Sequence, residues 1–183
     1  MTLVELKSER LIYRTLTLND VTESYVSWLN DPDVNQYLEI RHISHNIENC
    51  RHFVETINLD DSQHLLGIFW FEDKNLGQLH IGNIKLGFIN QYHLRGQLSL
   101  FIGEKRFWGK GLGTEAIRTV TQWGFDSLGL DKIEAGCYED NLSSLRCFLK
   151  VGYQVEGFFR SHVVLNGQRK GSFWLGVLPH ELI

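Results

Sequence analysis

Residues 108–116 read WGKGLGTEA, and this glycine-rich turn decides the fold. The alternating stretch at 97–103 predicts a strand before the turn, and apolar residues spaced for one buried face predict a helix from about Lys110 to Ser127 after it. Glycines allow a backbone to approach a ligand closely, and the first N–H groups of a helix have no partner within the helix. Together with the helix dipole, these groups form an anion site that suits a pyrophosphate.

Two other phosphate-binding motifs fit the turn poorly. A P-loop needs GxxxxGK[ST], and the glycine spacing here fails it. The dinucleotide fingerprint GxGxxG is met at Gly109 and Gly111, but Thr114 stands where the third glycine belongs. That fingerprint also follows the first strand of a parallel sheet, whereas an antiparallel hairpin is predicted before this turn. A tight strand-to-helix turn without a ligand is the alternative.

A second informative segment is 141–153, NLSSLRCFLKVGY, which follows a predicted strand at 132–138. Asn141 suits the N-cap of a helix, and Ser144 suits its first turn. Gly152 suits the left-handed position that ends such a helix. These structural roles explain the residue types without requiring any chemistry.

The remaining elements follow one another without a linker, a repeat or a shift in composition, so one α+β domain over residues 1–183 is expected. Asn166-Gly167 predicts a hairpin between the last two strands, and a further turn is predicted at Glu72 to Asn75. The predicted strands are 10–16, 64–71, 78–88, 97–103, 132–138, 153–164 and 169–177. Besides the helix from Lys110, the predicted helices run from Asn19-Asp20 to about Asn30, from about Asn46 to Leu59 and over 142–150, with a loop from Asn35 to Ser44.

The composition excludes several classes of protein. Hydrophobic residues make up 43% of the chain and prolines number 2, which excludes disorder and collagen-like fibres. No apolar run approaches the roughly 20 residues of a membrane helix, and the N-terminus lacks a signal-peptide pattern. A net charge of −4 gives no footprint for duplex nucleic acid, and Cys50, Cys137 and Cys147 form no disulfide or zinc motif. We therefore expect a cytoplasmic protein without a metal, nucleic-acid or membrane partner.

Taken together, the segments 108–116 and 141–153 resemble the GNAT superfamily of acetyl-CoA-dependent N-acetyltransferases. They are most similar to its branch of ribosomal-protein N-terminal acetyltransferases, with the pattern WGKGxxTEA followed by NxxSxRxxxKxG[FY]. The likeness runs from Glu9-Arg10-Leu11 to the segment 156–160. It implies a single mixed, mostly antiparallel sheet of about seven strands with about four flanking helices. That sheet is splayed between the strands at 97–103 and 132–138, where acetyl-CoA is held.

The resemblance also implies which residues bind acetyl-CoA. Edge backbone at 101–103 pairs with the pantetheine arm, backbone N–H groups at 109–114 hold the pyrophosphate, and Asn141 bonds the pantetheine or acetyl region. Trp108 departs from the Gln or Arg that is frequent in the wider superfamily, which removes one polar contact. The candidate cofactor-binding residues are Phe101, Ile102, Gly103, Trp108, Gly109, Lys110, Gly111, Leu112, Gly113, Thr114, Asn141 and Ser144.

The chemistry implied is attack of a free amine on the thioester carbonyl, with an oxyanion formed and a thiolate released. Backbone N–H groups stabilise the oxyanion, and a donor protonates the thiolate. Many superfamily members use a tyrosine seven positions after the asparagine; here that position is Phe148, which cannot donate, so Ser144 is the candidate acid. An alkyl amine has a pKa near ~10, so a base must also accept a proton. The candidate bases are Glu104, His80, His93 and Glu139, with a chain of waters as the alternative.

The acceptor amine is less well defined by the sequence. In this family the loop from Asn35 to Ser44 and the hairpin at Asn166 line the acceptor side, where Arg41, His42 and His45 give a modest positive charge or a solvated loop. The stretch 80–90 is similar to members that acetylate 4-amino groups of nucleotide-linked sugars, and these loops are not rich in the carboxylates that a polyamine site requires. We expect a small-molecule amine, such as a nucleotide-linked amino sugar. The alternatives are a protein N-terminus or a non-catalytic acyl-CoA-binding module. A monomer or homodimer is implied by the resemblance.

Overall fold

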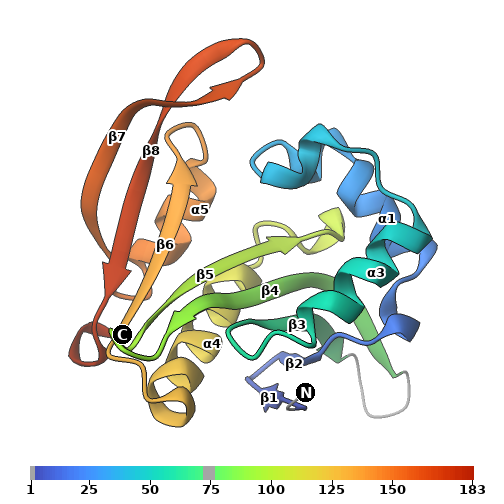
Figure 1. The fold of residues 1–183 in the computed structure, drawn as a ribbon, viewed down its shortest axis with the longest axis horizontal. Helices are drawn as coiled ribbons and strands as arrows, with labels where there is room; N and C mark the ends of the chain where they lie inside the picture. Colours follow the sequence, from blue (N-terminus) through green and yellow to red (C-terminus); the bar gives the residue numbers. More distant parts are fainter. Residues whose placement is uncertain (1–2, 72–76) are drawn as a thin grey trace.

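The computed structural model describes residues 3–71 and 77–183, in which eight strands form one sheet of order β1-β2-β3-β4-β5-β6-β8-β7 (Figure 1). All neighbouring strands are antiparallel except β5 and β6, which are parallel. This confirms the predicted mixed, mostly antiparallel sheet. The strands are β1 (Glu5–Lys7), β2 (Leu11–Thr15), β3 (His64–Phe71), β4 (Gln78–Asn90), β5 (Arg95–Ile102), β6 (Lys132–Tyr138), β7 (Gln154–Leu165) and β8 (Gln168–Val177).

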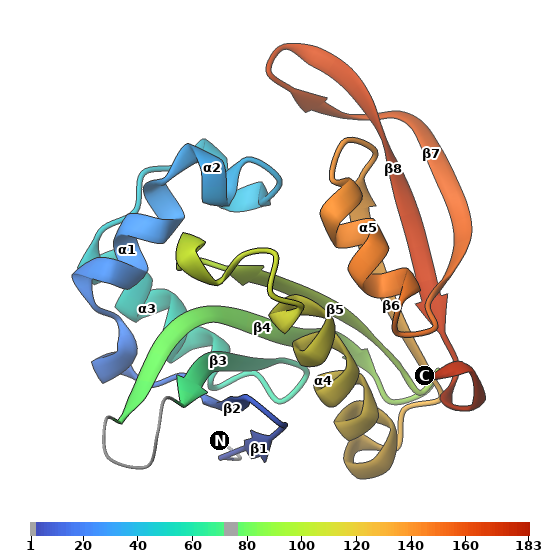
Figure 2. The ribbon, with the colours of Figure 1, turned by 180° about the vertical axis from the view of Figure 1, so that it is seen from behind.

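Helices cover the two faces of the sheet unequally. On one face α4 and α5 pack over the core that contains Leu112, Ile117 and Phe148 (Figure 2). On the other face α1 and α3 bury a second core around Tyr25 and Val54. In Figure 1, no helix covers this second face over β6, β8 and β7. The helices are α1 (Glu23–Asn30), α2 (Pro32–Asn35), α3 (Ile47–Ile57), α4 (Leu112–Leu128) and α5 (Leu142–Leu149).

Three local predictions need correction. The first helix begins at Glu23 after the N-cap Thr22, not at Asn19-Asp20, because the Asp20 carboxylate bonds Thr17 and closes a short 3₁₀ turn before it. The loop expected at 35–44 contains a second 3₁₀ turn, η2 (Glu39–His42). The structure has one strand more than predicted, β1, which is only 3 residues long and is too short to show a clear alternation of apolar and polar residues.

Two other boundaries are as predicted, the end of the first helix and the last hairpin turn. Helix α1 ends at Asn30, since Asp31 before Pro32 adopts an extended conformation. Asn166 and Gly167 both have positive φ, 50° and 75°, as a two-residue hairpin turn requires. The turn predicted at Glu72 to Asn75 lies outside the described residues.

The parallel pair β5 and β6 is joined at one end only. Arg95–Gln97 pair with Lys132–Glu134, and beyond these residues the two strands diverge (Figure 2). We call this divergence the splay and call the end near Ile102 and Tyr138 its open end. The splay was predicted between these two strands, and the structure confirms it. Because the strands are parallel, the turns that follow both of them lie at the same open end, and each leads into a helix, α4 or α5.

Candidate functional site

The edge of β5 that faces the splay is made by alternate residues. The N–H of Gly103 bonds the Ile81 carbonyl at 2.8 Å, so Gly103 faces β4. Backbone groups alternate along a strand, so those of Phe101 also face β4 while those of Leu100 and Ile102 face the splay. The three edge residues expected from the sequence are thus divided. Ile102 lies at the open edge, whereas Phe101 and Gly103 are turned towards β4, and Leu100 was missed.

Trp108 adds a contact at this edge. Its indole Nε1 donates to the Ile102 carbonyl at 2.7 Å. The turn η3 (Lys105–Phe107) precedes Trp108 and brings it back along the strand. The single hydrogen-bond donor of the Trp108 side chain is therefore used on the backbone of this chain.

The glycine turn has the backbone that an anion site requires. Gly109 and Gly111 have φ of 72° and 78°, a region that side chains other than glycine rarely adopt. Helix α4 starts at Leu112 rather than Lys110, and its N-cap Gly111 offers no side chain to bond the first N–H groups. The Leu112 side chain is buried, so only its backbone is available at the turn. The uncapped first turn of α4 therefore fits a pyrophosphate.

A hollow of about 400 Å³ opens beside this turn. Ser8 and Arg10 line it from the segment between β1 and β2, Gly111 and Thr114 from the turn, and Arg118 and Lys150 from the helices, the last at the C-cap of α5. Three cationic side chains therefore stand around the hollow next to the N-terminus of α4, together with the carboxylates of Glu9 and Glu115.

Helix α5 starts at the open end of the splay. Asn141 is its N-cap, and its Oδ1 accepts from the Ser144 N–H at 3.2 Å and from the Ser143 hydroxyl at 3.0 Å. Ser143 thus commits its hydroxyl to the cap, whereas Ser144 contributes only its N–H and is half-buried. Phe148 lies in the core with its ring against Tyr153, at 4.9 Å between centroids. The position of the usual tyrosine is therefore occupied by a core residue.

The four candidate bases lie in different places. His80 is enclosed by the rings of Phe69, Tyr25 and Trp28, and its Nε2 lies 2.8 Å from Asn83 Oδ1. Burial lowers the pKa of His80 below its ordinary value, against the opposing effect of its hydrogen bonds. These contacts argue against a catalytic role for His80 and for a structural one.

His93 lies in the turn that precedes Arg95, where β5 and β6 are still paired, so it is at the opposite end of β5 from the open end. Glu139 directly follows the end of β6, and Glu104 follows the end of β5 after Gly103. Glu104 is one-third exposed and lies 3.6 Å from Arg106. These two carboxylates lie at the open end; His93 does not, and His80, which the register of β4 and β5 places near the end of β5, is enclosed by aromatic rings.

Tyr138, which the sequence did not single out, connects the two sides of the open end. It donates its hydroxyl to Glu39 and accepts a hydrogen bond from Arg41 at 2.9 Å. Arg41 also donates to the Val164 carbonyl at 3.2 Å, and the Tyr37 ring meets the edge of the Tyr138 ring. Burial raises the pKa of Tyr138, Glu39 raises it further and Arg41 opposes both. These contacts link residues about 100 positions apart, so no local pattern reveals them.

The uncovered face of β8 and β7 carries further aromatic residues. Ser172 is paired with both Tyr138 and Phe159 across the strands, which puts the three side chains on one face. The Phe159 ring lies 6.4 Å from Trp174, and His162 Nδ1 lies 2.6 Å from the Ser172 hydroxyl. A row of aromatic and hydroxyl side chains therefore extends from the open end across this face.

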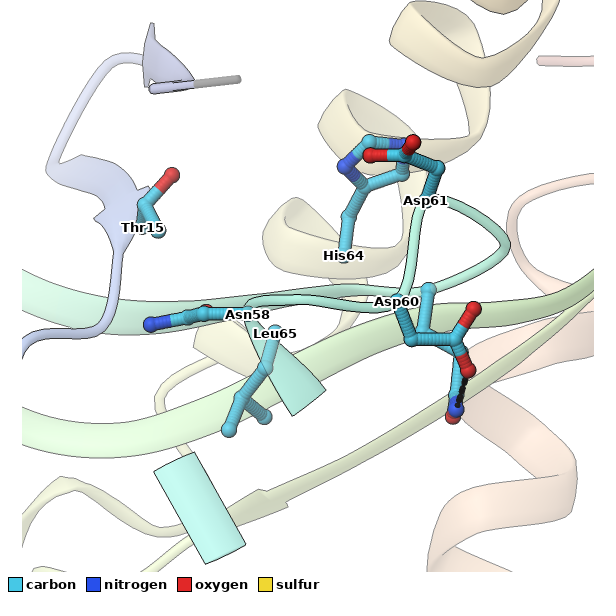
Figure 3. A pocket seen from close by; sticks show the side chains of 7 residues that line it. Thr15, Asn58, Asp60, Asp61, His64 and Leu65 are labelled. Carbon is cyan, nitrogen blue, oxygen red and sulfur yellow. Dashed lines mark hydrogen bonds between the residues drawn. The ribbon is translucent and has the colours of Figure 1, made fainter. Parts of the chain in front are cut away.

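A second hollow, at the turn between α3 and β3, has no part in this arrangement (Figure 3). Asp60, which lines it, accepts hydrogen bonds from Ser62 and Gln63, and these lower the pKa of Asp60 to about 2. Asn58 donates to the Leu16 carbonyl at 2.8 Å. The polar groups here are thus used to close the turn.

Within residues 3–71 and 77–183, no three His, Cys, Asp or Glu side chains are grouped to hold a metal ion. No helix in the same ranges is long and apolar enough to cross a membrane.

Comparison with known proteins identifies the class that this fold and site define. The family described as "Acetyltransferase (GNAT) domain" matches residues 10–154. The uncharacterized N-acetyltransferase YoaA of Bacillus subtilis is 30% identical over 167 residues, which cover 88% of this chain and 89% of YoaA. The chain therefore belongs to the GNAT acetyltransferase family and is an acetyl-CoA-dependent N-acetyltransferase.

Solved structures show the same fold. The spermidine N-acetyltransferase of Vibrio cholerae, in complex with CoA and spermine, has a TM-score of 0.84 at 18% identity, covering 95% of this chain and 98% of that one. The microcin C7 self-immunity acetyltransferase MccE, in complex with acetyl-CoA and AMP, has a TM-score of 0.79 at 20% identity, covering 93% of each chain.

Proposed function

We propose that this enzyme acetylates the primary amine of a small molecule that carries a sugar or planar ring, such as a nucleotide-linked amino sugar. The observation that carries this proposal is the aromatic face that leads to the open end, where the exposed Phe159 and the half-buried Trp174 lie beside the buried Tyr138. Such rings bury the flat side of a sugar or base through dispersion and stacking. Residues 1–183 act as one domain in this proposal.

The charges on the acceptor side favour a ring over a polycation. Arg41 lies beside Glu39, and Lys170 pairs with Asp140 at 2.9 Å. A polyamine site needs carboxylates that are free to meet several ammonium groups, and here Glu39 and Asp140 already have cationic neighbours. The spermine in the Vibrio cholerae structure makes a polyamine the main competitor, whereas the AMP in the MccE structure supports an acceptor with a nucleotide part.

Acetyl-CoA supplies the activated acetyl group, and the residues of this chain bind it and move protons. The first-turn N–H groups of α4 and the backbone at Gly109 and Gly111 hold the pyrophosphate. The splay-facing backbone of Leu100 and Ile102 pairs with the pantetheine arm, and the amide of Asn141 bonds the pantetheine or acetyl region. The uncapped helix start and the edge of β5 beyond Gln97, which β6 does not pair with, are the features that support this assignment.

Two protons have to move at the open end. Ser144 gives its hydroxyl proton to the leaving thiolate and regains one from the attacking nitrogen, which loses its second proton as the amide forms; the hydroxyl is free for this because it is not committed to the helix cap as that of Ser143 is. Glu104, which lies just beyond the end of β5, accepts a proton of the incoming ammonium group. His80 is not retained as a base in this proposal, because it is enclosed by three aromatic rings.

The acceptor proposal is tested by release of CoA thiol in the presence of three amines at equal concentration: a nucleotide-linked 4-amino sugar, spermidine and a short peptide with a free N-terminal serine. We expect the highest kcat/KM with the amino sugar. A higher value with spermidine or the peptide would replace the acceptor but keep the chemistry. CoA binding without turnover on any amine would favour a non-catalytic acyl-CoA-binding module.

A further inference from the structure

The segment between β1 and β2 contacts the start of α4 through the side chain of Arg10. Its Nε and Nη2 atoms each lie 2.7 Å from Glu115 Oε2, and Nη1 donates to the Lys110 carbonyl at 3.0 Å. Glu115 Oε1 accepts from the Ser8 hydroxyl at 2.6 Å and from the Arg10 backbone N–H at 2.8 Å. One guanidinium therefore contacts both the glycine turn and the first turn of the helix that follows.

The charge of Glu115 is unfavourable for the role proposed for this turn. Its backbone N–H bonds the Gly111 carbonyl at 3.1 Å, and its side chain is only 13% exposed, so water screens the carboxylate weakly. A carboxylate in the first turn of a helix stabilises that helix. A carboxylate there also repels a diphosphate that binds the first-turn N–H groups. Left without a cation, Glu115 would weaken the anion site.

We propose that Arg10 is a positioning residue for acetyl-CoA. Its guanidinium cancels the charge of Glu115, so that the turn at 109–114 accepts a pyrophosphate. The inference rests on the pyrophosphate site given under the proposed function. Arg10 stands close enough for this, because its Nη2 lies 3.7 Å from where a Cβ on Gly111 would be. Arg10 and Glu115 also line the hollow beside the turn.

The ionisation of Glu115 is consistent with this role. Burial alone would raise the pKa of its carboxyl, but hydrogen bonds from Ser8 and Arg10, with the charge of Arg10, hold that pKa below its ordinary value. The hydrogen bonds from Ser8 and the backbone of residue 10 persist when the Arg10 side chain is replaced. Glu115 therefore stays ionised and in place in such a variant, with its negative charge uncompensated.

The test is titration calorimetry of CoA into R10M, E115Q and the double variant R10M/E115Q. We expect R10M to bind CoA about tenfold more weakly, because it leaves a charged neighbour at the anion site. E115Q should bind at least as tightly as the wild type, and the double variant should recover most of the loss seen in R10M. Unchanged CoA affinity in R10M, or a double variant as weak as R10M, would overturn the proposal.

R14M is the matched control, because Arg14 pairs with Asp20 at 2.6 Å in a similarly half-buried ion pair away from the turn. It should lower stability and leave CoA affinity unchanged, whereas equal weakening of CoA binding in R14M and R10M would overturn the proposal.

If R10M does not fold, the CoA affinity of E115Q alone decides, since weaker CoA binding by E115Q contradicts the proposal. Normal CoA binding by Gly111→Glu would reject the pyrophosphate site itself, which separates that failure from a failure of the Arg10 role.

Discussion

Ser144 and Ser143 are adjacent hydroxyls with different surroundings, and that difference allows a matched test at the scale of one residue. Ser143 donates to the Asn141 cap, while Ser144 is proposed to protonate the leaving thiolate. Ser144→Ala should lower kcat by at least about tenfold and leave acetyl-CoA affinity unchanged, because general-acid catalysis acts on the transition state. Ser143→Ala should keep kcat near the wild-type value. Equal kcat in both variants would remove Ser144 from the mechanism and leave water as the donor.

Arg41 is the residue that joins η2 to both β6 and β7. Its side chain is 12% exposed and bonds Leu38, Tyr138 and Val164. Arg41→Met should cost about 1–3 kcal/mol of unfolding free energy, because buried partners lose their donors. It should also raise KM for the amine without changing acetyl-CoA affinity. Unfolding curves and steady-state kinetics measure the two effects.

His42→Ala is the control for Arg41→Met, because His42 is an exposed neighbour in the same short turn. It should change neither property. If His42→Ala raises KM for the amine as much as Arg41→Met does, the contact with Tyr138 is not what shapes the acceptor side.

At the scale of one element, the two ends of α4 carry glycines of similar backbone geometry. Gly111 at the N-cap has a φ of 78°, and Gly129 at the C-cap has a φ of 65°. Glutamate at either position costs about 1–2 kcal/mol of backbone strain. Gly111→Glu should abolish CoA binding, because it adds a side chain and a negative charge at the uncapped turn, whereas Gly129→Glu should bind normally. Calorimetry on the two variants, matched for stability, tests the turn; normal binding by Gly111→Glu would contradict the assignment.

The ion pair between Arg10 and Glu115 also predicts that the stability of the fold depends on pH. The folded-state pKa of Glu115 lies below the ordinary value of 4.5, so its contribution is complete above that pH and is lost as the pH falls through the lower folded-state value. Glu115→Gln removes this contribution. Its unfolding free energy should therefore fall less than that of the wild type between pH 6 and acid pH, in urea titrations at a series of pH values. Parallel curves for the two proteins would contradict the stabilising role of the ion pair.

Helices and strands whose apolar residues recur at regular spacing could be predicted from the sequence. Contacts between segments that are distant in the sequence could not. The buried positions of α4, from Leu112 to Val120, recur at helical spacing, and Asn141 has the side chain of an N-cap. Alternation along β5 predicts which face a side chain occupies but not which edge its backbone faces, so Leu100 was missed at the splay. Tyr138 and Glu39 are 99 residues apart, and only the folded chain brings them together.

At the scale of the whole molecule, the splay and the glycine turn form one site, because the parallel strands β5 and β6 bring the starts of α4 and α5 to the same open end. The most direct test of this account is thermal unfolding with and without acetyl-CoA. At 100 times its Kd the ligand adds about 2.7 kcal/mol, which raises Tm by roughly 5–10 °C in a chain of this size. We predict that shift with acetyl-CoA and none with ATP or NADH. No shift with acetyl-CoA, or an equal shift with ATP, would contradict the central claim that this open end is built for acetyl-CoA.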